Sequence, residues 1–363
     1  NALDANTTAS HNTAIGSTAL TTNTTGASNT ALGANTLVLN TTASNNTGLG
    51  FQALQDNSTG QSNTGVGANS ITNNTTGNYN TAVGVDSLKA NTTASNNTAV
   101  GYDALTLNTT GTNNVAVGAY SLDANTTGGE NVAVGNESLS ATTTGASNTG
   151  VGYRALKTNI TGSSNTAFGS QALNNNTVSF NTAFGAYAMQ NSTTGTNNVA
   201  IGPEVLKANT SADYNTAVGR SALKVNTTGS QNVAIGGLAL DANTTGSYNT
   251  GIGRSTLGAT TTGGANTAVG YYALEKNTTA SNNTGVGFLA LQDNTTGTQN
   301  VAIGVNALSD NTTANNNTSV GYTALTANTT GVDNTAVGHS ALYSCVSGTA
   351  NVAVGNNALR TAT

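Results

Sequence analysis

Residues 80–97 read N-T-A-V-G-V-D-S-L-K-A-N-T-T-A-S-N-N, and the same pattern starts again with N-T-A-V-G at 97–101. Glycines that end such segments recur at every seventeenth position from Gly16 to Gly355, apart from one interval, between Gly169 and Gly185, that is one position shorter. A fixed period of this kind marks a repeat architecture, in which each unit buries its interior against its neighbours. The 363-residue chain therefore consists of about 21 copies of one unit.

The positions of the unit, counted from this repeat glycine, differ in which residues they carry. Asn stands four positions before the glycine, a small residue two before, an apolar residue one before, and Leu four after in nearly every unit. All 23 charged residues (9 Lys and Arg, 14 Asp and Glu) lie one, two, five, six, eleven or twelve positions after it. Because charged side chains are rarely buried, we expect these six positions to face solvent and the others to form the walls and the interior.

Seventeen residues are too few for a helix pair or a propeller blade, but they suit one coil of a β-solenoid. The N-T-A-V segment alternates between larger and small residues, which predicts a short strand. We therefore expect an all-β solenoid with one coil per repeat and about 21 coils, stacked about 4.8 Å apart into a rod on the order of 100 Å long. Residues 1–363 are expected to be a single continuous solenoid, a fragment of a longer fibre with no cap visible at either end.

Stacking places identical side chains above one another, so we expect hydrogen-bonded columns of Asn and packed columns of Val and Leu. Burial of one such apolar side chain contributes roughly 1.5–3 kcal/mol and a hydrogen bond about 1 kcal/mol, so a lone coil would not fold. The position that is always small forms either a tight internal wall or a seam between chains. The predicted ladders comprise Asn29, Asn80, Asn97 and Asn114; Val83, Val100 and Val117; and Leu88, Leu105 and Leu122.

One unit, residues 170–185, lacks a residue in its N-T-T-G corner. Phe168, Phe180 and Phe184 surround this corner, and Met189 follows it. Two explanations are open: the larger apolar side chains fill the space that the missing residue leaves, or the coil forms a bend.

Few side chains could support catalysis or bind a metal. The two histidines, His11 and His339, lie far apart in the sequence in variable positions, and Cys345 is the single cysteine. Acidic residues occupy no fixed position of the repeat, unlike those of calcium-binding repeats, and no pair of carboxylates, such as Asp123 and Glu137, stands out as the acid and base of a glycosidase. We predict no catalytic residue, no metal site and no cofactor, and hence no enzyme.

Composition limits the partners. The net charge is −5 and the nine Lys and Arg do not cluster, so nucleic acid is not expected; no run of 18 apolar residues exists, so no membrane span is expected in this segment. The N-T-T corner also matches the N-glycosylation pattern, although turn chemistry explains its regularity better. Aromatic residues one position after the glycine are candidate contacts for sugar rings or neighbouring rods, or incidental surface residues: Phe51, Tyr102, Tyr153, Tyr271, Phe288 and Tyr322.

The unit at 80–93, N-T-A-V-G followed by S-L and N-T-T, resembles repeats of bacterial and phage tail-fibre-domain proteins. The resemblance covers essentially the whole chain and implies a surface fibre. The N-T-A-V-G core is more distantly similar to an N-S-V-A-I-G element in the head repeats of trimeric autotransporter adhesins, which implies homotrimers. The longer turn and the added N-T-T-G corner depart from that second family.

These observations together favour a structural or adhesive fibre located outside the cell, on a cell surface or on a virion. The expected partners are copies of the same chain, with a trimer favoured over a larger filament, and a cell-surface glycan or receptor. The alternative function is ice binding through stacked threonines, such as Thr24-Thr25 and Thr92-Thr93, of which only one rank can face outward in an extended segment.

Overall fold

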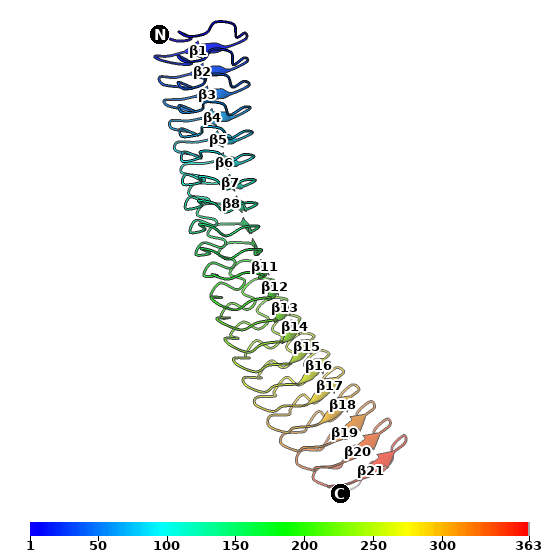
Figure 1. The fold of residues 1–363 in the computed structure, drawn as a ribbon. Coiled ribbons are helices and arrows are strands. Elements are labelled where there is room, and N and C mark those ends of the chain that lie inside the picture. Colours follow the sequence, from blue (N-terminus) through cyan, green and yellow to red (C-terminus); the bar gives the residue numbers. More distant parts are fainter. Residues whose placement is uncertain (362–363) are drawn as a thin grey trace. The chain divides into compact units, whose positions relative to one another are not determined.

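The structure, a computed structural model that describes residues 1–361, is an all-β solenoid, as the repeat predicts. Each coil, about seventeen residues long, contributes one three-residue strand, and no helix occurs among the described residues. The chain divides into two compact units, residues 1–180 and residues from 181 onward. In each unit the strands form one parallel sheet that runs from coil to coil (Figure 1).

The strands have the following bounds. The first unit contains β1 (Thr13–Ile15), β2 (Thr30–Leu32), β3 (Thr47–Leu49), β4 (Thr64–Val66), β5 (Thr81–Val83), β6 (Thr98–Val100), β7 (Val115–Val117), β8 (Val132–Val134), β9 (Thr149–Val151) and β10 (Thr166–Phe168). The second unit contains β11 (Thr182–Phe184), β12 (Val199–Ile201), β13 (Thr216–Val218), β14 (Val233–Ile235), β15 (Thr250–Ile252), β16 (Thr267–Val269), β17 (Thr284–Val286), β18 (Val301–Ile303), β19 (Thr318–Val320), β20 (Thr335–Val337) and β21 (Val352–Val354).

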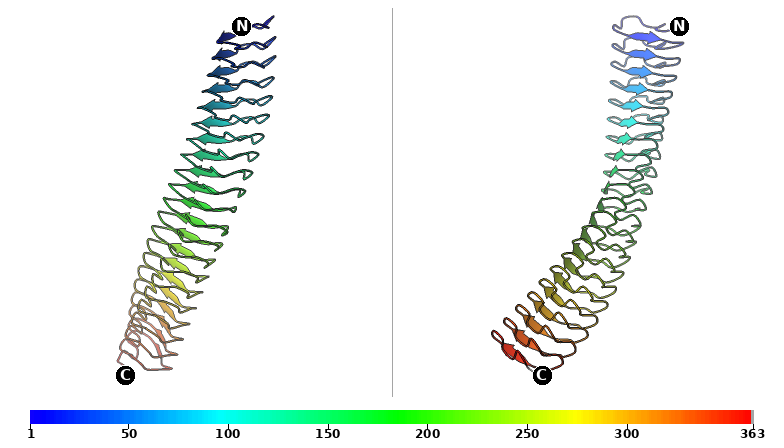
Figure 2. Two further views of the ribbon diagram at one scale, coloured as in Figure 1. Left: turned by 90° about the vertical axis from the view of Figure 1, so that its left-hand side faces the viewer. Right: turned by 180° about the vertical axis from the view of Figure 1, so that it is seen from behind.

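Neighbouring strands pair in parallel with equivalent residues opposite each other. Val83 is opposite Val100, and Val100 is opposite Val117. The strands make up one wall of each unit, while the rest of the coil consists of turns (Figure 2). Like residues therefore stack on like residues, as the fixed period predicts.

The turns depend on left-handed backbone conformations. The repeat glycine Gly84 has a φ of 140°, and a Cβ atom there would lie 2.3 Å from the carbonyl oxygen of Gly101 in the next coil, so only glycine fits. Residues two, four and twelve positions after this glycine are also left-handed although they are rarely glycine; Asp86 and Leu88 have φ values of 56° and 52°. Each such residue costs roughly 1–2 kcal/mol, which the packing of the stack must offset.

The interior of each coil is thin. Leu88, Leu105 and Leu122 are completely buried in it. The small residue two before the repeat glycine faces the same interior: a Cβ atom on Gly48 would lie 3.6 Å from Cδ1 of Leu37. Of the two explanations for the small position, the structure shows the tight internal wall.

The prediction that Val83, Val100 and Val117 pack inside the solenoid is wrong. Val83 and Val117 are 38% and 36% exposed, whereas Ala82, next to Val83 in the alternation, is completely buried. Strand residues point alternately to the two faces of a sheet, and the leucine leaves room for only a small side chain on the inner face. The larger apolar residue of each strand therefore points outward.

Buried asparagines form two ladders that join successive coils. In the first, the backbone N–H of Asn80 donates to Oδ1 of Asn63 at 2.9 Å, while its Nδ2 donates to the carbonyl oxygen of Ala94 at 2.8 Å. In the second, seven positions after the repeat glycine, Nδ2 of Asn91 donates to Oδ1 of Asn74 at 2.8 Å. The predicted residues Asn29, Asn97 and Asn114 make the same contacts as Asn80 to the coils before and after them.

The coil with the missing residue keeps the local contact of its corner asparagine, although Oδ1 of Asn159 in the preceding coil has no hydrogen-bond partner. Nδ2 of Asn176 donates to the carbonyl oxygen of Val178 at 2.7 Å, two residues away instead of the usual three. Phe168, Phe180 and Phe184 are 38%, 60% and 40% exposed. The prediction that these rings fill space inside the shortened corner is therefore wrong.

Candidate functional site

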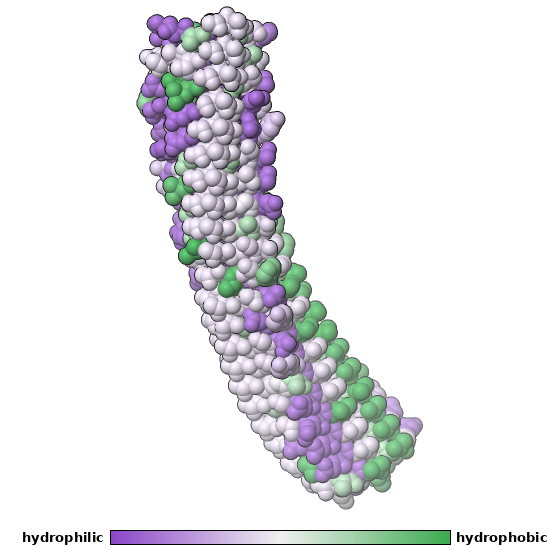
Figure 3. Space-filling view, viewed as in Figure 1, coloured by the Kyte–Doolittle hydropathy of each residue, from purple (hydrophilic) through white to green (hydrophobic). Residues whose placement is uncertain are grey.

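The outer sheet face, defined as the residues three and one positions before each repeat glycine, is uncharged, and one of its two positions is always a large apolar residue. The position one before the glycine is Val, Ile, Leu or Phe in each of the 21 strands. Ile201 and Ile303 are typical of it, with 42% and 41% of their surfaces exposed. Thr or Val occupies the other position. Figure 3 shows a row of hydrophobic atoms along the second unit, where the same view in Figure 1 places the strands from β12 onward.

No charged residue lies on the outer sheet face of either unit. Ten strands in the first unit and eleven in the second, spaced about 4.8 Å apart with about 7 Å between the two outward residues, give an uncharged face of a few hundred Å² in each unit. A face of this size is comparable to the largest apolar patch of a typical monomeric protein, which is often an interaction site. The absence of charge at both positions is visible in the sequence of each repeat. It did not predict an outer face, because large apolar residues are expected in the interior.

The aromatic residues predicted as surface contacts are all exposed, at the turn that follows the strand. Some of these rings meet a ring of the next coil: Tyr271 and Phe288 stack with centroids 5.7 Å apart, Tyr322 stacks on His339 at 5.2 Å, and Tyr102 meets Tyr120 edge-to-face at 5.4 Å. The full predicted set of exposed residues is Phe51, Tyr102, Tyr153, Tyr271, Phe288 and Tyr322.

Charged residues pair across neighbouring coils on the turns. Glu137 accepts hydrogen bonds from Arg154 of the next coil, at 2.9 Å to Nε, and forms an ion pair with Lys157. The hydrogen bonds from these two side chains hold the pKa of the Glu137 carboxyl below its usual range. Sequence spacing alone did not reveal such pairs, because residues one repeat apart become neighbours only when the coils stack.

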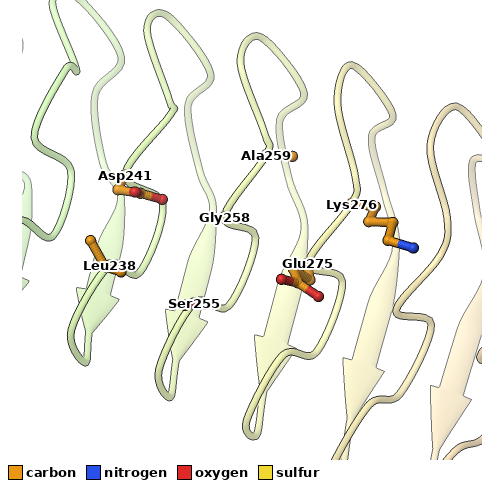
Figure 4. A pocket seen from close by; sticks show the side chains of 7 residues that line it. All are labelled: Leu238, Asp241, Ser255, Gly258, Ala259, Glu275 and Lys276. Atoms are coloured by element: carbon orange, nitrogen blue, oxygen red, sulfur yellow. The ribbon is translucent and has the colours of Figure 1, made fainter.

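Two shallow grooves open among these charged turns, one in each unit. The first has a volume of about 330 Å³ and the second of about 310 Å³. The first brings together the two carboxylates, Asp123 and Glu137, which sequence reasoning had not ranked above others. Its lining is Tyr120, Asp123, Glu137, Ser140 and Lys157; that of the second is Leu238, Asp241, Ser255, Gly258, Ala259, Glu275 and Lys276 (Figure 4).

The two adjacent threonines of each corner have different surroundings. Oγ1 of Thr92 donates to the carbonyl oxygen of Thr109 in the next coil at 3.2 Å, and this bond recurs along both units. Thr93 is exposed. One threonine rank therefore belongs to the bonds between coils, and the other forms a single exposed row.

The corner asparagines Asn40 and Asn91 are not accessible to a glycosylating enzyme in the folded coil, whereas Asn45 and Asn96, which begin N-N-T triplets, are exposed. Asn40 and Asn91 are completely buried, and Nδ2 of each donates to Oδ1 of the equivalent asparagine one coil earlier and to a backbone carbonyl. Attachment of a glycan to Nδ2 at these positions would require the coil to open.

Within residues 1–361, no three or more His, Cys, Asp or Glu residues gather where they could hold a metal ion. The same residues include no helix with the length and apolarity that crossing a membrane requires. Cys345 is buried in the place of a ladder asparagine.

Comparison with known proteins gives no relative. No family model matches the chain, and no curated protein matches it significantly. The candidate sites therefore rest on the geometry described above.

Proposed function

We propose that this chain is a structural and adhesive segment of an extracellular fibre, in which copies of the solenoid associate side by side through the outer sheet face. The observation that carries the proposal is the uncharged face formed by the strands of each unit, on which every strand exposes one large apolar residue. Leaving it in water would expose hydrophobic side chains in every coil.

A second copy of the chain is the partner that this surface fits best. Its residues recur at the spacing of parallel strands, about 4.8 Å, along a whole unit. A compact protein offers no surface with the same repeat, whereas another copy offers the same apolar position in each coil. A trimer is favoured over a larger filament because of the resemblance to adhesin head repeats.

The mass of the native particle tests the assembly. We expect about three times the 35.7 kDa of the chain by sedimentation equilibrium, and thin rods by electron microscopy. A monomeric mass at micromolar concentration, or globular particles, would contradict the proposal.

A matched pair of triple variants tests the surface itself. Val83→Lys, Val100→Lys and Val117→Lys together place three charges on the outer sheet face and should leave monomeric rods. The control places lysine at three exposed apolar residues away from that face, Val85, Leu107 and Val305, and should assemble normally. Circular dichroism of both variants establishes that the coils still fold.

The exposed rank of threonines supports ice binding as a second candidate function. A regular row of hydroxyl and methyl groups, of which Thr93 is one member, could order water. Thermal hysteresis measures this activity directly, and we expect none, because one row on a turn is narrow and the neighbouring rank, including Thr92, is bonded to the next coil. Hysteresis that disappears when exposed threonines are changed to lysine would favour ice binding over the fibre.

A further inference from the structure

The two grooves of the charged turns share the first part of their construction. Each begins with an aspartate five positions after a repeat glycine, Asp123 in the first unit and Asp241 in the second. The equivalent position of the next coil holds a small residue, Ser140 or Gly258. The coil after that differs: this position is Lys157 in the first groove and Glu275 in the second, where the adjacent Lys276 forms an ion pair with Asp293. An aspartate followed by a small residue one coil later is therefore what the two grooves have in common.

The small residue in the middle coil creates the space. Side chains two coils apart are separated by about 10 Å along the stack, and the short middle residue leaves the gap between them open. In the second groove, a Cβ atom on Gly258 would lie 3.6 Å from Oδ1 of Asp241, so the gap borders the carboxylate. Figure 4 shows Asp241 and Glu275 on the coils that flank Gly258.

The aspartate at the head of the first groove has an unused hydrogen-bond acceptor. Oδ1 of Asp123 is buried and has no hydrogen-bond partner. Burial raises the pKa of this carboxyl to about 6, and the charges of Asp103 and Glu137 add to the effect. Burial also raises the pKa of Asp241. Because Oδ1 is shielded from solvent, a ligand that donates a hydrogen bond reaches it only after the carboxyl group turns toward the groove, and the bond then supplies the donor that this acceptor lacks.

Charges in the first groove balance. Glu137 is paired with Arg154 and Lys157, so two acidic groups, counting Asp123, face two basic ones. A strongly anionic or cationic ligand would meet repulsion from one pair or would have to break an existing ion pair. The lining therefore suits a neutral ligand with several hydroxyl groups.

Each groove also has an apolar wall. The Tyr120 ring lines the first groove and is held edge-to-face against Tyr102, with ring centroids 5.4 Å apart; Leu238 lines the second. A sugar ring presents C–H groups on its face and hydroxyl groups on its edge, which matches an apolar wall beside polar acceptors and donors.

We propose that the two grooves are subsites for single neutral sugar rings of a surface glycan. Asp123 or Asp241 accepts hydrogen bonds from ring hydroxyls, Lys157 donates to a ring or hydroxyl oxygen in the first groove, and Tyr120 or Leu238 covers the ring face. This inference rests on the adhesive part of the proposed function, for which it specifies the ligand. It does not depend on whether the rods assemble.

Saturation-transfer difference NMR with methyl glycosides of glucose, galactose and mannose tests the proposal on the full chain. We expect saturation of at least one glycoside, with weaker signals from glucuronate and glucosamine, which carry a charge. The signal should fall by about tenfold in the double variant Asp123→Asn with Asp241→Asn. No saturation of any neutral glycoside, or stronger saturation of a charged sugar, would overturn the proposal.

Blocking variants provide the matched control. Ser140→Tyr with Gly258→Tyr fills both grooves and should abolish the signal. Ser309→Tyr makes the same change at the same repeat position, where the preceding coil carries Gln292 in place of an aspartate, and should leave it intact; Tyr343 shows that tyrosine fits this position. Equal signals from the blocked and control variants would place sugar binding outside the grooves. Native mass, measured in parallel, keeps this outcome separate from a failure of assembly.

Discussion

Thr142 stands one coil after Asn125, in the place where most coils carry an asparagine, and Oδ1 of Asn125 is buried without a hydrogen-bond partner. In most other coils the next asparagine of this ladder supplies the donor, as Asn125 itself does for Oδ1 of Asn108 at 2.8 Å. The threonine hydroxyl instead donates to the carbonyl oxygen of Asn159. The same gap occurs where Thr260 follows Asn243, whose Oδ1 also lacks a partner.

Thr142→Asn is therefore expected to stabilise the first unit. It supplies a donor to the orphaned Oδ1 of Asn125 and should raise the free energy of unfolding by about 1 kcal/mol, measured by urea denaturation. Thr260→Asn should act in the same direction in the second unit. Thr143→Asn, one residue away and outside the ladder, is the control; an equal gain there would show that the ladder is not the cause.

Two adjacent glycines should respond oppositely to the same change. Gly236 has a φ of 136°, and its added Cβ atom would lie 2.4 Å from the carbonyl oxygen of Gly253, whereas a Cβ atom on Gly237 would meet nothing within 4 Å. Gly236→Ala should cost about 2 kcal/mol or more. Gly237→Ala should be neutral or stabilise by up to about 0.5 kcal/mol. The thermal midpoints of the two variants, followed by circular dichroism, give the comparison directly.

Asp123→Asn should stabilise the protein at neutral pH. Because burial raises the folded-state pKa of Asp123 from 3.8 to about 6, the folded chain binds this proton more tightly than the unfolded chain. The cost of the buried charge is therefore fully present above about pH 6 and disappears below about pH 4. Since the residue is only half-buried, we expect a gain of about 1 kcal/mol at pH 7, and none at pH 3.5.

Glu204 provides the control of opposite sign. Its hydrogen bonds from Lys224 and Lys207 lower the pKa of its carboxyl, so Glu204→Gln should lower stability at pH 7. The difference from wild type should vanish as the pH falls through the folded-state pKa. Thermal unfolding across pH 3.5 to 8 tests both variants, and parallel curves for the two would contradict this assignment. If the Asp123→Asn variant is more stable than wild type and yet binds sugar less, the loss of binding cannot be due to unfolding.

Leu88 and Val83 should differ in what their truncation affects. Leu88 is completely buried and Val83 is exposed. Leu88→Ala should cost about 2–5 kcal/mol through the cavity that it leaves, whatever the assembly state. Val83→Ala should change the stability of a separate chain by less than about 1 kcal/mol. If the outer sheet face is a seam, Val83→Ala weakens assembly, which the concentration dependence of the native mass reports.

The repeat period predicted the solenoid, its register and its asparagine columns, because each follows from stacking identical units. The direction in which Val83 points could not be predicted from the T-A-V alternation, which defines two faces but does not say which is inside. Leu88 decides this, since its side chain fills the interior opposite the strand. Its left-handed backbone also had no sequence signal, because leucine rarely adopts that conformation.

The grooves were beyond sequence reasoning for a different reason. Asp123, Ser140 and Lys157 are separated by one full repeat at each step, and each is an ordinary member of a variable position. Only the stack shows that the short Ser140 leaves a gap between its neighbours. By contrast, the sequence does show that the two repeat positions of the outer sheet face lack charge. Only the structure shows that these two positions point outward.

The hydrogen bonds between coils within each unit run from one coil to the next, as from the Thr81 amide to Asn97 at 2.9 Å and from the Leu88 amide to Ala104 at 3.0 Å. A force that pulls the two ends of a unit apart would break these hydrogen bonds one coil at a time. A coil that opens releases one repeat of chain, which lengthens the fibre by roughly 50 Å. If the chain is part of a fibre, as proposed, that fibre would yield under drag in equal steps and rewind when the pull stops, so the repeat would absorb shocks.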